Sequence, residues 1–320
     1  MRILLWHVHG SWTTAFVQGG HDYLLPVAPD RGADGRGRAA TWDWPASAVE
    51  VPLGDLASAE PDLVVLQRPE EVDLVRRLLG REPGRDLRAV YVEHNTPRGD
   101  VGAARHPMAD RADVPVVHVT YFNDVYWDCG RAPTAVVEHG VCDPGHRYRG
   151  ELARAAVAIN EPVRRGRVTG TDLLAGFATE VPLDVFGMQV EGLADVLGLG
   201  SERLTTYEDP PQHRLHDLMA ARRVYLHPHR WTSLGLSLIE AMHLGMPVVA
   251  LAATEAVEAV PAGAGVVSTR PEVLRRALRE YVHDPDAARE TGLRARQAAL
   301  HRYGLQRFLD DWDRMIKEVA

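Results

Sequence analysis

Short apolar runs alternate along the chain with segments whose apolar residues recur at helical spacing. In the first half these runs predict strands over residues 2–8, 23–27, 63–67, 89–94, 116–120 and 135–140. In the second half they predict strands over residues 155–160, 182–188, 224–228, 247–251 and 265–269. Unbroken apolar runs of this length are typical of strands that are buried on both faces of a parallel sheet.

Amphipathic segments lie between the predicted strands. They predict helices over residues 70–80, 171–180, 213–222 and 234–245, and a helical pattern from Pro271 onward with breaks at 283–286 and 303–304. Strands that alternate with helices indicate an α/β fold of two Rossmann-like, doubly wound domains. We place these domains at residues 1–148 and 149–300, followed by a C-terminal helix over 301–320 that packs back on the first domain.

Composition and charge restrict the class of protein. Apolar residues make up 45 % of the chain and charged residues 25 %, as in ordinary globular proteins. The net charge of −8 argues against nucleic acid as a partner. No stretch approaches the roughly 18–20 unbroken apolar residues that a membrane span requires. Of 36 basic residues only Lys317 is lysine, so any site that needs a cation must use arginine.

The cysteines and the first residues bear on the compartment. Cys129 and Cys142 are the only cysteines, and their spacing matches no paired motif. The first residues lead directly into an apolar run that predicts a strand, which is unlike a secretory signal. We therefore expect a cytoplasmic protein.

Residues 231–251, WTSLGLSLIEAMHLGMPVVAL, combine a polar start, an apolar helix and a single carboxylate, Glu240. The segment follows the predicted strand 224–228, at the edge where open α/β sheets bind ligands. Thr232 and Ser233 are candidates to cap the helix, and Gly235 would let a phosphate approach its first amides. Glu240 could accept hydrogen bonds from ribose hydroxyls. The alternative is an ordinary amphipathic helix with a solvated glutamate.

The same segment resembles the C-terminal signature of retaining GT-B glycosyltransferases of family 4. Gly235 and Leu236 match the Gly-Leu at the helix start, residues 240–242 match Glu-Ala-Met, and residues 245–249 match Gly-x-Pro-Val-Val. The resemblance implies two Rossmann-like domains that face each other across a cleft. It also implies that Glu240 holds the donor ribose. The family's first glutamate, which contacts the transferred sugar, is replaced here by Thr232.

A second match lies just after the first predicted strand of the second domain. The family has an arginine and a lysine there, which neutralise the donor diphosphate. Arg164 falls near the family arginine, Thr169 occupies the lysine position, and Arg165 is a neighbouring cation that could substitute for the lysine. The alternative is a solvated basic turn.

Two strand ends of the first domain carry further candidates. Gly10 and Ser11 follow the first strand, where the family has a glycine loop that faces the acceptor and the sugar. His94 and Asn95 follow the strand 89–94, and a histidine at this position of the family contacts the transferred sugar. This polar cluster before Pro97 could equally be turn chemistry.

Three histidine pairs, at 7/9, 213/216 and 227/229, lack a third ligand at zinc-like spacing, so we expect no metal site. The resemblance implies metal-independent glycosyl transfer with retention, from a nucleotide-diphosphate sugar to a small-molecule or glycan acceptor, without a cofactor. Two alternatives stay open. One is a nucleotide-sugar-binding protein without turnover, and the other is a nucleotide-sugar epimerase of the same fold.

Overall fold

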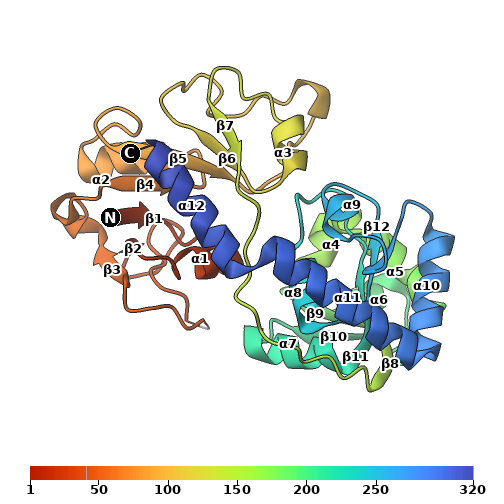
Figure 1. The fold of residues 1–320 in the computed structure, drawn as a ribbon. Helices are drawn as coiled ribbons and strands as arrows, with labels where there is room; N and C mark the ends of the chain where they lie inside the picture. Colours follow the sequence, from red (N-terminus) through yellow and green to blue (C-terminus); the bar gives the residue numbers. More distant parts are fainter. Residues whose placement is uncertain (41, 320) are drawn as a thin grey trace. The chain divides into compact units, whose positions relative to one another are not determined.

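The computed structural model describes residues 1–40 and 42–319, and the chain divides into two compact units. Unit 1 comprises Met1–Cys142 and Leu305–Ala320, and unit 2 comprises Asp143–Gly304. The corresponding boundaries predicted from the sequence lie after residues 148 and 300. Each unit contains one sheet flanked by helices, and the last helix, α12, belongs to unit 1 (Figure 1).

Unit 1 is built on a seven-stranded parallel sheet in the order β3-β2-β1-β4-β5-β6-β7. Its strands are β1 (Arg2–Leu5), β2 (Asp22–Val27), β3 (Ala48–Pro52), β4 (Leu63–Leu66), β5 (Arg88–Glu93), β6 (Val116–His118) and β7 (Thr134–Val136). Its helices are α1 (Gly10–Phe16), α2 (Glu71–Leu79), α3 (Tyr121–Tyr126) and α12 (Leu305–Val319), with 3₁₀ turns at Leu53–Asp55, Ala57–Ala59 and Val101–Ala103. The strand order reverses between β1 and β4.

Unit 2 repeats this arrangement with six parallel strands in the order β10-β9-β8-β11-β12-β13. They are β8 (Leu152–Ala158), β9 (Leu183–Gly187), β10 (Leu204–Glu208), β11 (Arg222–His227), β12 (Val248–Leu251) and β13 (Gly265–Ser268). Its helices are α4 (Pro162–Arg165), η4 (Gly166–Thr169), α5 (Thr171–Ala178), α6 (Leu193–Leu197), α7 (Gln212–Ala221), α8 (Leu236–Leu244), α9 (Ala256–Ala259), α10 (Pro271–His283) and α11 (Pro285–Tyr303). The order reverses between β8 and β11, so both units are doubly wound, as predicted.

Two strands, β3 and β10, were not predicted from the hydrophobic pattern. Both lie at the edge of their sheet, and both carry partly exposed residues at most positions. An edge strand has only one neighbour, so it needs no continuous apolar run. Residues 204–208, LTTYE, therefore do not stand out in the hydrophobic pattern.

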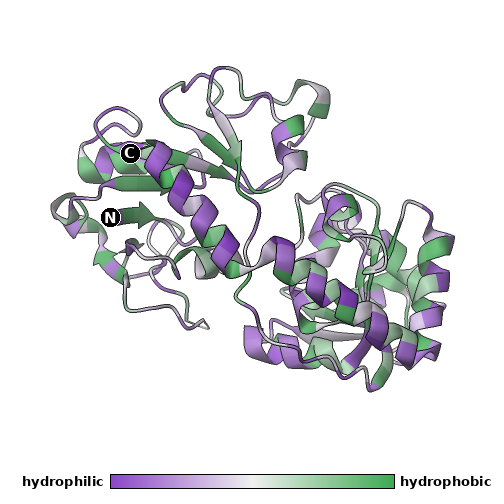
Figure 2. Cartoon of the chain, viewed as in Figure 1, coloured by the Kyte–Doolittle hydropathy of each residue, from purple (hydrophilic) through white to green (hydrophobic). Residues whose placement is uncertain are grey.

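Apolar side chains of the central strands form the core of each unit. Leu4, Val64 and Leu66 of unit 1 are fully buried, as are Val157, Val224 and others of unit 2. Figure 2 shows the central strands as largely hydrophobic, while the outer helices carry both hydrophobic and hydrophilic residues. This is the pattern expected for sheets covered by helices.

The C-terminal helix α12 packs against α1 and β5 of unit 1. Phe308 and Trp312 are buried on its inner face, and the Trp312 ring lies edge-on to Trp12 at 5.7 Å and to Phe16 at 5.1 Å. A Cβ atom at Gly140 would lie 2.3 Å from the Cβ of Phe308, so only glycine allows this approach. The last segment of the chain is therefore part of the core of unit 1.

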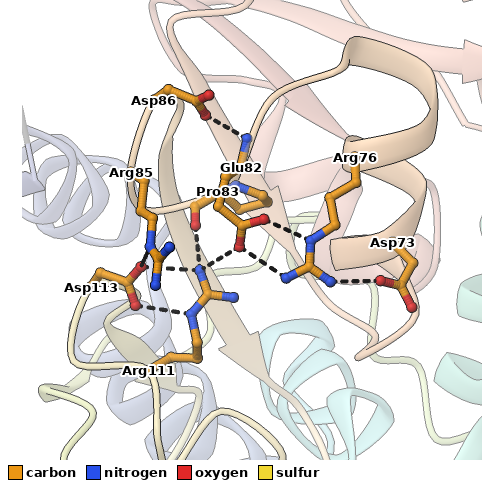
Figure 3. Close-up of polar contacts among 8 residues, drawn as sticks. All are labelled: Asp73, Arg76, Glu82, Pro83, Arg85, Asp86, Arg111 and Asp113. Atoms are coloured by element: carbon orange, nitrogen blue, oxygen red, sulfur yellow. Dashed lines mark hydrogen bonds and ion pairs between the residues drawn. The ribbon is translucent and has the colours of Figure 1, made fainter.

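Ion pairs join the end of α2 to the loop before β5 (Figure 3). Arg76 donates to Glu82 at 2.6 and 2.9 Å and to Asp73 at 2.7 Å, and these bonds hold the pKa of Glu82 below its usual value. Arg111 lies 3.2 Å from Glu82 and donates to Asp113 at 2.9 Å. These pairs are partly exposed and stabilise the unit little individually. They fix the connections at the amino ends of the strands, opposite the edge where such sheets bind ligands.

Within residues 1–40 and 42–319, no helix is both long enough and apolar enough to cross a membrane.

Candidate functional site

Two loops of unit 2 meet at the carboxyl ends of β8 and β11, where the strand order reverses. The first loop runs over residues 159–170 and the second over residues 228–235. The amides of Arg230 and Trp231 both donate to the carbonyl of Val168, at 2.9 and 3.1 Å. The two loops therefore form one continuous surface at the edge where doubly wound sheets bind ligands.

Gly170 allows the two loops to approach each other. Its φ is +74°, and a Cβ atom there would lie 2.0 Å from the carbonyl oxygen of Pro228. Any side chain would strain the backbone and push the second loop away. Gly166 in the same loop has a φ of +47° and no atom within 4 Å of the Cβ position.

We expect Gly170→Ala to destabilise unit 2 much more than Gly166→Ala. Both variants incur backbone strain of about 1–3 kcal/mol, and only Gly170→Ala adds a clash of about 1–3 kcal/mol with a backbone atom. Urea unfolding followed by circular dichroism measures the difference. Equal destabilisation by the two variants would show that the loops do not pack as described.

The two candidate arginines of the first loop lie in different surroundings. Arg164 is exposed, and its guanidinium donates to both carboxylate oxygens of Glu161. The Nε atom lies 2.9 Å from Oε1, and Nη2 donates to Oε2. Arg165 is partly buried, and its charge acts on His229 of the second loop. Burial, then His227 and Arg165, lower the pKa of His229 well below its usual value. The charge of Arg165 is therefore the one placed where the loops meet.

Thr169, the residue at the family's lysine position, is fully buried. Its hydroxyl lies 3.1 Å from the carbonyl of Gly166 and 3.0 Å from the hydroxyl of Thr171. The Thr171 hydroxyl in turn donates to the carbonyl of Pro162 at 2.8 Å. These hydrogen bonds lie within the loop, so Thr169 holds the shape of the segment that carries the arginines.

Helix α8 begins later than the sequence analysis expected. Its N-cap is Gly235, and no side chain caps it, so Thr232 and Ser233 are not the caps we predicted. Both residues lie in the preceding turn, because the chain first packs Ser233 and Leu234 into the core. The hydroxyl oxygen of Thr232 is buried and makes no hydrogen bond to the residues that the structure describes.

The start of α8 packs closely on His227, the last residue of β11. A Cβ atom at Gly235 would lie 2.5 Å from the ring of His227, which stacks on His229 at 4.3 Å. In the turn that starts at Leu236, the hydroxyl of Ser237 lies 2.9 Å from that of Tyr225. The glycine therefore brings the first amides of α8 directly to the strand end. These amides can bind an anion such as a phosphate.

Glu240 lies in the middle of α8, and only 5 % of its surface is exposed. The Nε2 atom of His216 on α7 lies 3.6 Å from Glu240 Oε2, too far for a good hydrogen bond. A buried carboxylate is costly unless it has polar partners. Beyond it, Gly245 ends α8 with a φ of +87°, a conformation that glycine adopts without strain.

In unit 1, His94 follows β5 and lies against the side chain of Gln67, which follows β4. The Gln67 amide nitrogen donates to the carbonyl of Trp6 at 2.8 Å, so its oxygen faces His94 Nε2 at 3.1 Å. This network assigns the ring proton to Nε2 and leaves Nδ1 as an acceptor. Burial, then His9 and His139, lower the pKa of His94 well below its usual value, so the ring is neutral.

Two further histidines lie near His94 and follow other strands of the same sheet. The ring of His9, after β1, lies 4.0 Å from that of His94. His139, after β7, is buried, and burial lowers its pKa to about 3, with smaller contributions from His9 and Arg307. Burial also lowers the pKa of His9 to about 4. At neutral pH the three rings form an uncharged polar group that can exchange hydrogen bonds with hydroxyls.

The other candidates of unit 1 flank this group. Gly10 and Ser11 begin α1, directly after His9. Asn95 is exposed, and its backbone amide donates to Glu93 at 2.6 Å. His139 and Gln67 were not among the predicted site residues, and His9 was considered only as half of a metal pair. For His9 and Gln67 the usable signal was their position after a buried strand, whereas β7, which precedes His139, is partly exposed.

Among the residues that the structure describes, no three His, Cys, Asp or Glu side chains gather as ligands of a metal ion would.

Comparison with known families and structures agrees with this geometry. The model of the family Glycosyl transferases group 1 matches residues 181–298. A search of curated proteins gave no match. The sucrose-phosphate synthase of Thermosynechococcus elongatus is similar in structure, with a TM-score of 0.73 at 15 % identity over 99 % of this chain and 98 % of that one. Anabaena HepE, solved with UDP, has a TM-score of 0.70 at 15 % identity over 99 % and 100 % of the chains.

A glycosyltransferase from Rickettsia africae is also similar, with a TM-score of 0.69 at 13 % identity over 99 % of this chain and 98 % of that one. At these identities the structures establish the fold, and the family match establishes the type of domain in unit 2. Residues 181–298 are thus a glycosyl transferases group 1 domain in a chain with the GT-B fold, which supports sugar transfer by a glycosyltransferase as the activity of this protein.

Proposed function

We propose that this protein transfers a glycosyl unit from a nucleotide-diphosphate sugar to an acceptor hydroxyl, with retention at the anomeric carbon and without a metal ion. The observation that carries the proposal is the meeting of two loops and the start of α8 at the switch point of unit 2. This arrangement offers amides and a cation next to a buried carboxylate. A nucleoside diphosphate needs these three kinds of partner.

In this proposal Glu240 accepts hydrogen bonds from the donor ribose. Its carboxylate is buried, and two ribose hydroxyls would give it strong, charge-assisted hydrogen bonds. The segment of Ser233, Gly235 and Leu236 presents the first amides of α8 to the diphosphate. Thr232 contacts the transferred sugar with its hydroxyl, which is buried and unbonded within the described residues.

The diphosphate is the leaving group, and negative charge grows on it as the sugar C1–O bond breaks. Fixed cations stabilise that charge more in the transition state than in the bound donor. We assign this role to Arg165, with Arg164 as a second cation that is drawn from its ion pair with Glu161 when the donor binds. Thr169 keeps the loop in shape from within.

Unit 1 binds the acceptor in this proposal, through Gly10, Ser11 and Asn95. The neutral His94 ring contacts the transferred sugar, with Nδ1 accepting a hydrogen bond from a sugar hydroxyl. The acceptor oxygen attacks C1 from the face that the diphosphate leaves, and its proton passes to the departing phosphate oxygen. Front-face attack of this kind retains the anomeric configuration.

A panel of nucleotides tests the donor site directly. UDP, GDP, ADP and dTDP are compared by thermal shift, and we expect one of them to raise the melting temperature. A ligand at 100 times its Kd adds about 2.7 kcal/mol of stability. Anabaena HepE was solved with UDP and with UDP-glucose, so UDP is the first choice. If none of the four stabilises the protein, the proposed donor site is wrong.

Thr232 distinguishes this protein from the family pattern, and Thr232→Glu tests its role. We expect the variant to lower kcat/KM on the true donor, because a glutamate would crowd the pocket or bury an unpaired charge. Thr232→Ser, which keeps the hydroxyl, is the matched control and should retain activity. If Thr232→Glu instead exceeds the wild type with UDP-glucose or GDP-mannose, the native protein is a nucleotide-sugar-binding protein rather than an active enzyme.

A further inference from the structure

A basic cavity of about 440 Å³ lies in unit 1, between the end of β1 and the loop that follows β2. Its wall includes His7, Glu50 and three arginines, Arg31, Arg36 and Arg38. The volume falls within the roughly 300–1,000 Å³ typical of small-molecule sites. The whole chain carries a net charge of −8, so a concentration of arginines in one cavity is a local exception.

The loop after β2, which carries Arg31, Arg36 and Arg38, is tied to the sheet by hydrogen bonds. Gly37 donates its amide to the carbonyl of Pro26 at 2.9 Å, and Arg36 forms an antiparallel bridge with Val27. The amide of Arg38 donates to Glu50 at 2.8 Å, and its guanidinium donates to the backbone carbonyl of Pro45 at 2.9 Å. The cavity wall is therefore pre-formed, which lowers the entropy cost of binding a ligand.

The charges in the cavity do not cancel. Arg31 and Glu50 form a two-pronged ion pair at 2.8 and 3.1 Å, which neutralises both. The Arg38 guanidinium bonds to neutral backbone carbonyls, and its charge shares the Glu50 carboxylate with Arg31. The Arg36 guanidinium makes no hydrogen bond or ion pair to a residue within the described ranges. Burial, then the Arg36 charge, lower the pKa of His7, which leaves the ring neutral. Three arginines thus share the single carboxylate of Glu50 in the cavity wall, and a net positive charge remains.

The cavity borders the segment that we assign to the acceptor. The Cβ position at Gly10 lies 3.9 Å from His7 Nε2 and 3.8 Å from the indole nitrogen of Trp42. His7 lines the cavity, and Gly10 begins α1 only three residues later. A molecule bound in the cavity would therefore also reach the first residues of α1.

We propose that this cavity binds an oxyanion of the acceptor, a phosphate or a carboxylate, through Arg36 and Arg38. Guanidinium groups match the geometry of such anions and bind them with two parallel hydrogen bonds. The existence of an anion site follows from the cavity alone, whereas its assignment to the acceptor rests on the proposed function. The acceptor is accordingly an anionic molecule, such as a sugar phosphate or a lipid with a phosphate headgroup.

NMR of the His7 ring during titration with inorganic phosphate at fixed pH tests the anion site. We expect the His7 resonance to shift and saturate in the wild type, and the apparent Kd to rise at least tenfold in Arg36→Gln. The control is Arg88→Gln, which removes the same charge from an exposed position at the amino end of β5 and should behave as the wild type. An unmoved His7 resonance, or an equal response in Arg36→Gln, would overturn the anion site.

Competition then identifies the source of the anion. Glucose 6-phosphate, glucuronate and vesicles of phosphatidylglycerol are each added to the phosphate-loaded protein, with glucose and phosphatidylcholine vesicles as neutral controls. We expect one anionic competitor to displace phosphate from the wild type at lower concentration than the others, and to lose this advantage in Arg36→Gln. If none competes better than its neutral control, the cavity does not bind the acceptor.

Calorimetry with UDP separates this inference from the proposed function. UDP should bind Arg36→Gln as tightly as the wild type, because its site is assigned to unit 2. If UDP fails to bind either protein while phosphate still shifts His7, the proposed donor site fails and the anion site stands. If UDP binds both and phosphate has no effect on His7, the anion site fails alone.

Discussion

Glu240→Gln should weaken nucleotide binding by about 1.5–3 kcal/mol, which is roughly a 10- to 150-fold rise in Kd. The variant keeps the shape of the side chain and removes its charge, so it converts charge-assisted hydrogen bonds to the ribose hydroxyls into weaker neutral ones. The amide group also replaces one acceptor by a donor, which cannot accept a ribose hydroxyl proton. Isothermal calorimetry with the nucleotide that stabilises the wild type measures the effect.

The control is Glu180→Gln, a carboxylate in an ion pair with Arg279 just beyond the end of α5. Glu180 lies near the amino ends of the strands of unit 2, away from the proposed nucleotide site. The Glu180→Gln variant should therefore bind the nucleotide with unchanged affinity. Circular dichroism confirms that both variants remain folded. An unchanged Kd for the nucleotide in Glu240→Gln would show that Glu240 does not bind the ribose. An equal loss in Glu180→Gln would show that the effect is a general loss of structure.

Arg165→Gln should lower kcat by about 10²–10³-fold with a smaller change in nucleotide affinity. Removing one group that stabilises developing negative charge typically has an effect of this size. The interaction strengthens as the diphosphate leaves, so its loss appears in kcat more than in binding. Steady-state kinetics with saturating donor, beside calorimetry with the nucleoside diphosphate, separates the two effects.

Two neighbouring arginines make the comparison specific. Arg164→Gln should lower kcat less than Arg165→Gln, because Arg164 is exposed and must first leave Glu161. Arg167→Gln is the matched control, since the Arg167 side chain is exposed and pairs with Asp172 at 3.0 Å. Its kcat should stay close to the wild-type value. If Arg165→Gln retains normal kcat, the cation that stabilises the diphosphate lies elsewhere.

The hydrophobic pattern predicted the fold well, because buried parallel strands are continuous apolar runs. The apolar runs at residues 63–67 and 247–251 predict buried strands, and the structure contains β4 and β12 there. The pattern failed at β3 and β10, whose single neighbour leaves most of their residues partly exposed. Edge strands are set by the sheet that they join, and this information is not local in the sequence.

Residues of the candidate site could be predicted only where a strand end or a sequence motif was enough to identify them. His94 and Glu240 became candidates because His94 stands at the end of a recognisable strand and Glu240 lies within a recognisable signature. The helix start was misplaced, because packing of Ser233 and Leu234 into the core, rather than capping preference, decides where α8 begins. The basic cavity could not be predicted either. It depends on Glu50, from β3, neutralising Arg31 while it leaves Arg36 uncompensated.

The most direct test of the account is product analysis by NMR after incubation with a nucleotide-diphosphate sugar. The donor carries the nucleotide that binds tightest, and neutral and anionic sugars serve as acceptors. The account predicts a new glycosidic bond whose anomeric configuration is that of the donor, formed equally well in the presence of EDTA. A product of inverted configuration, an epimerised nucleotide sugar, or an unchanged donor that nevertheless binds would contradict it.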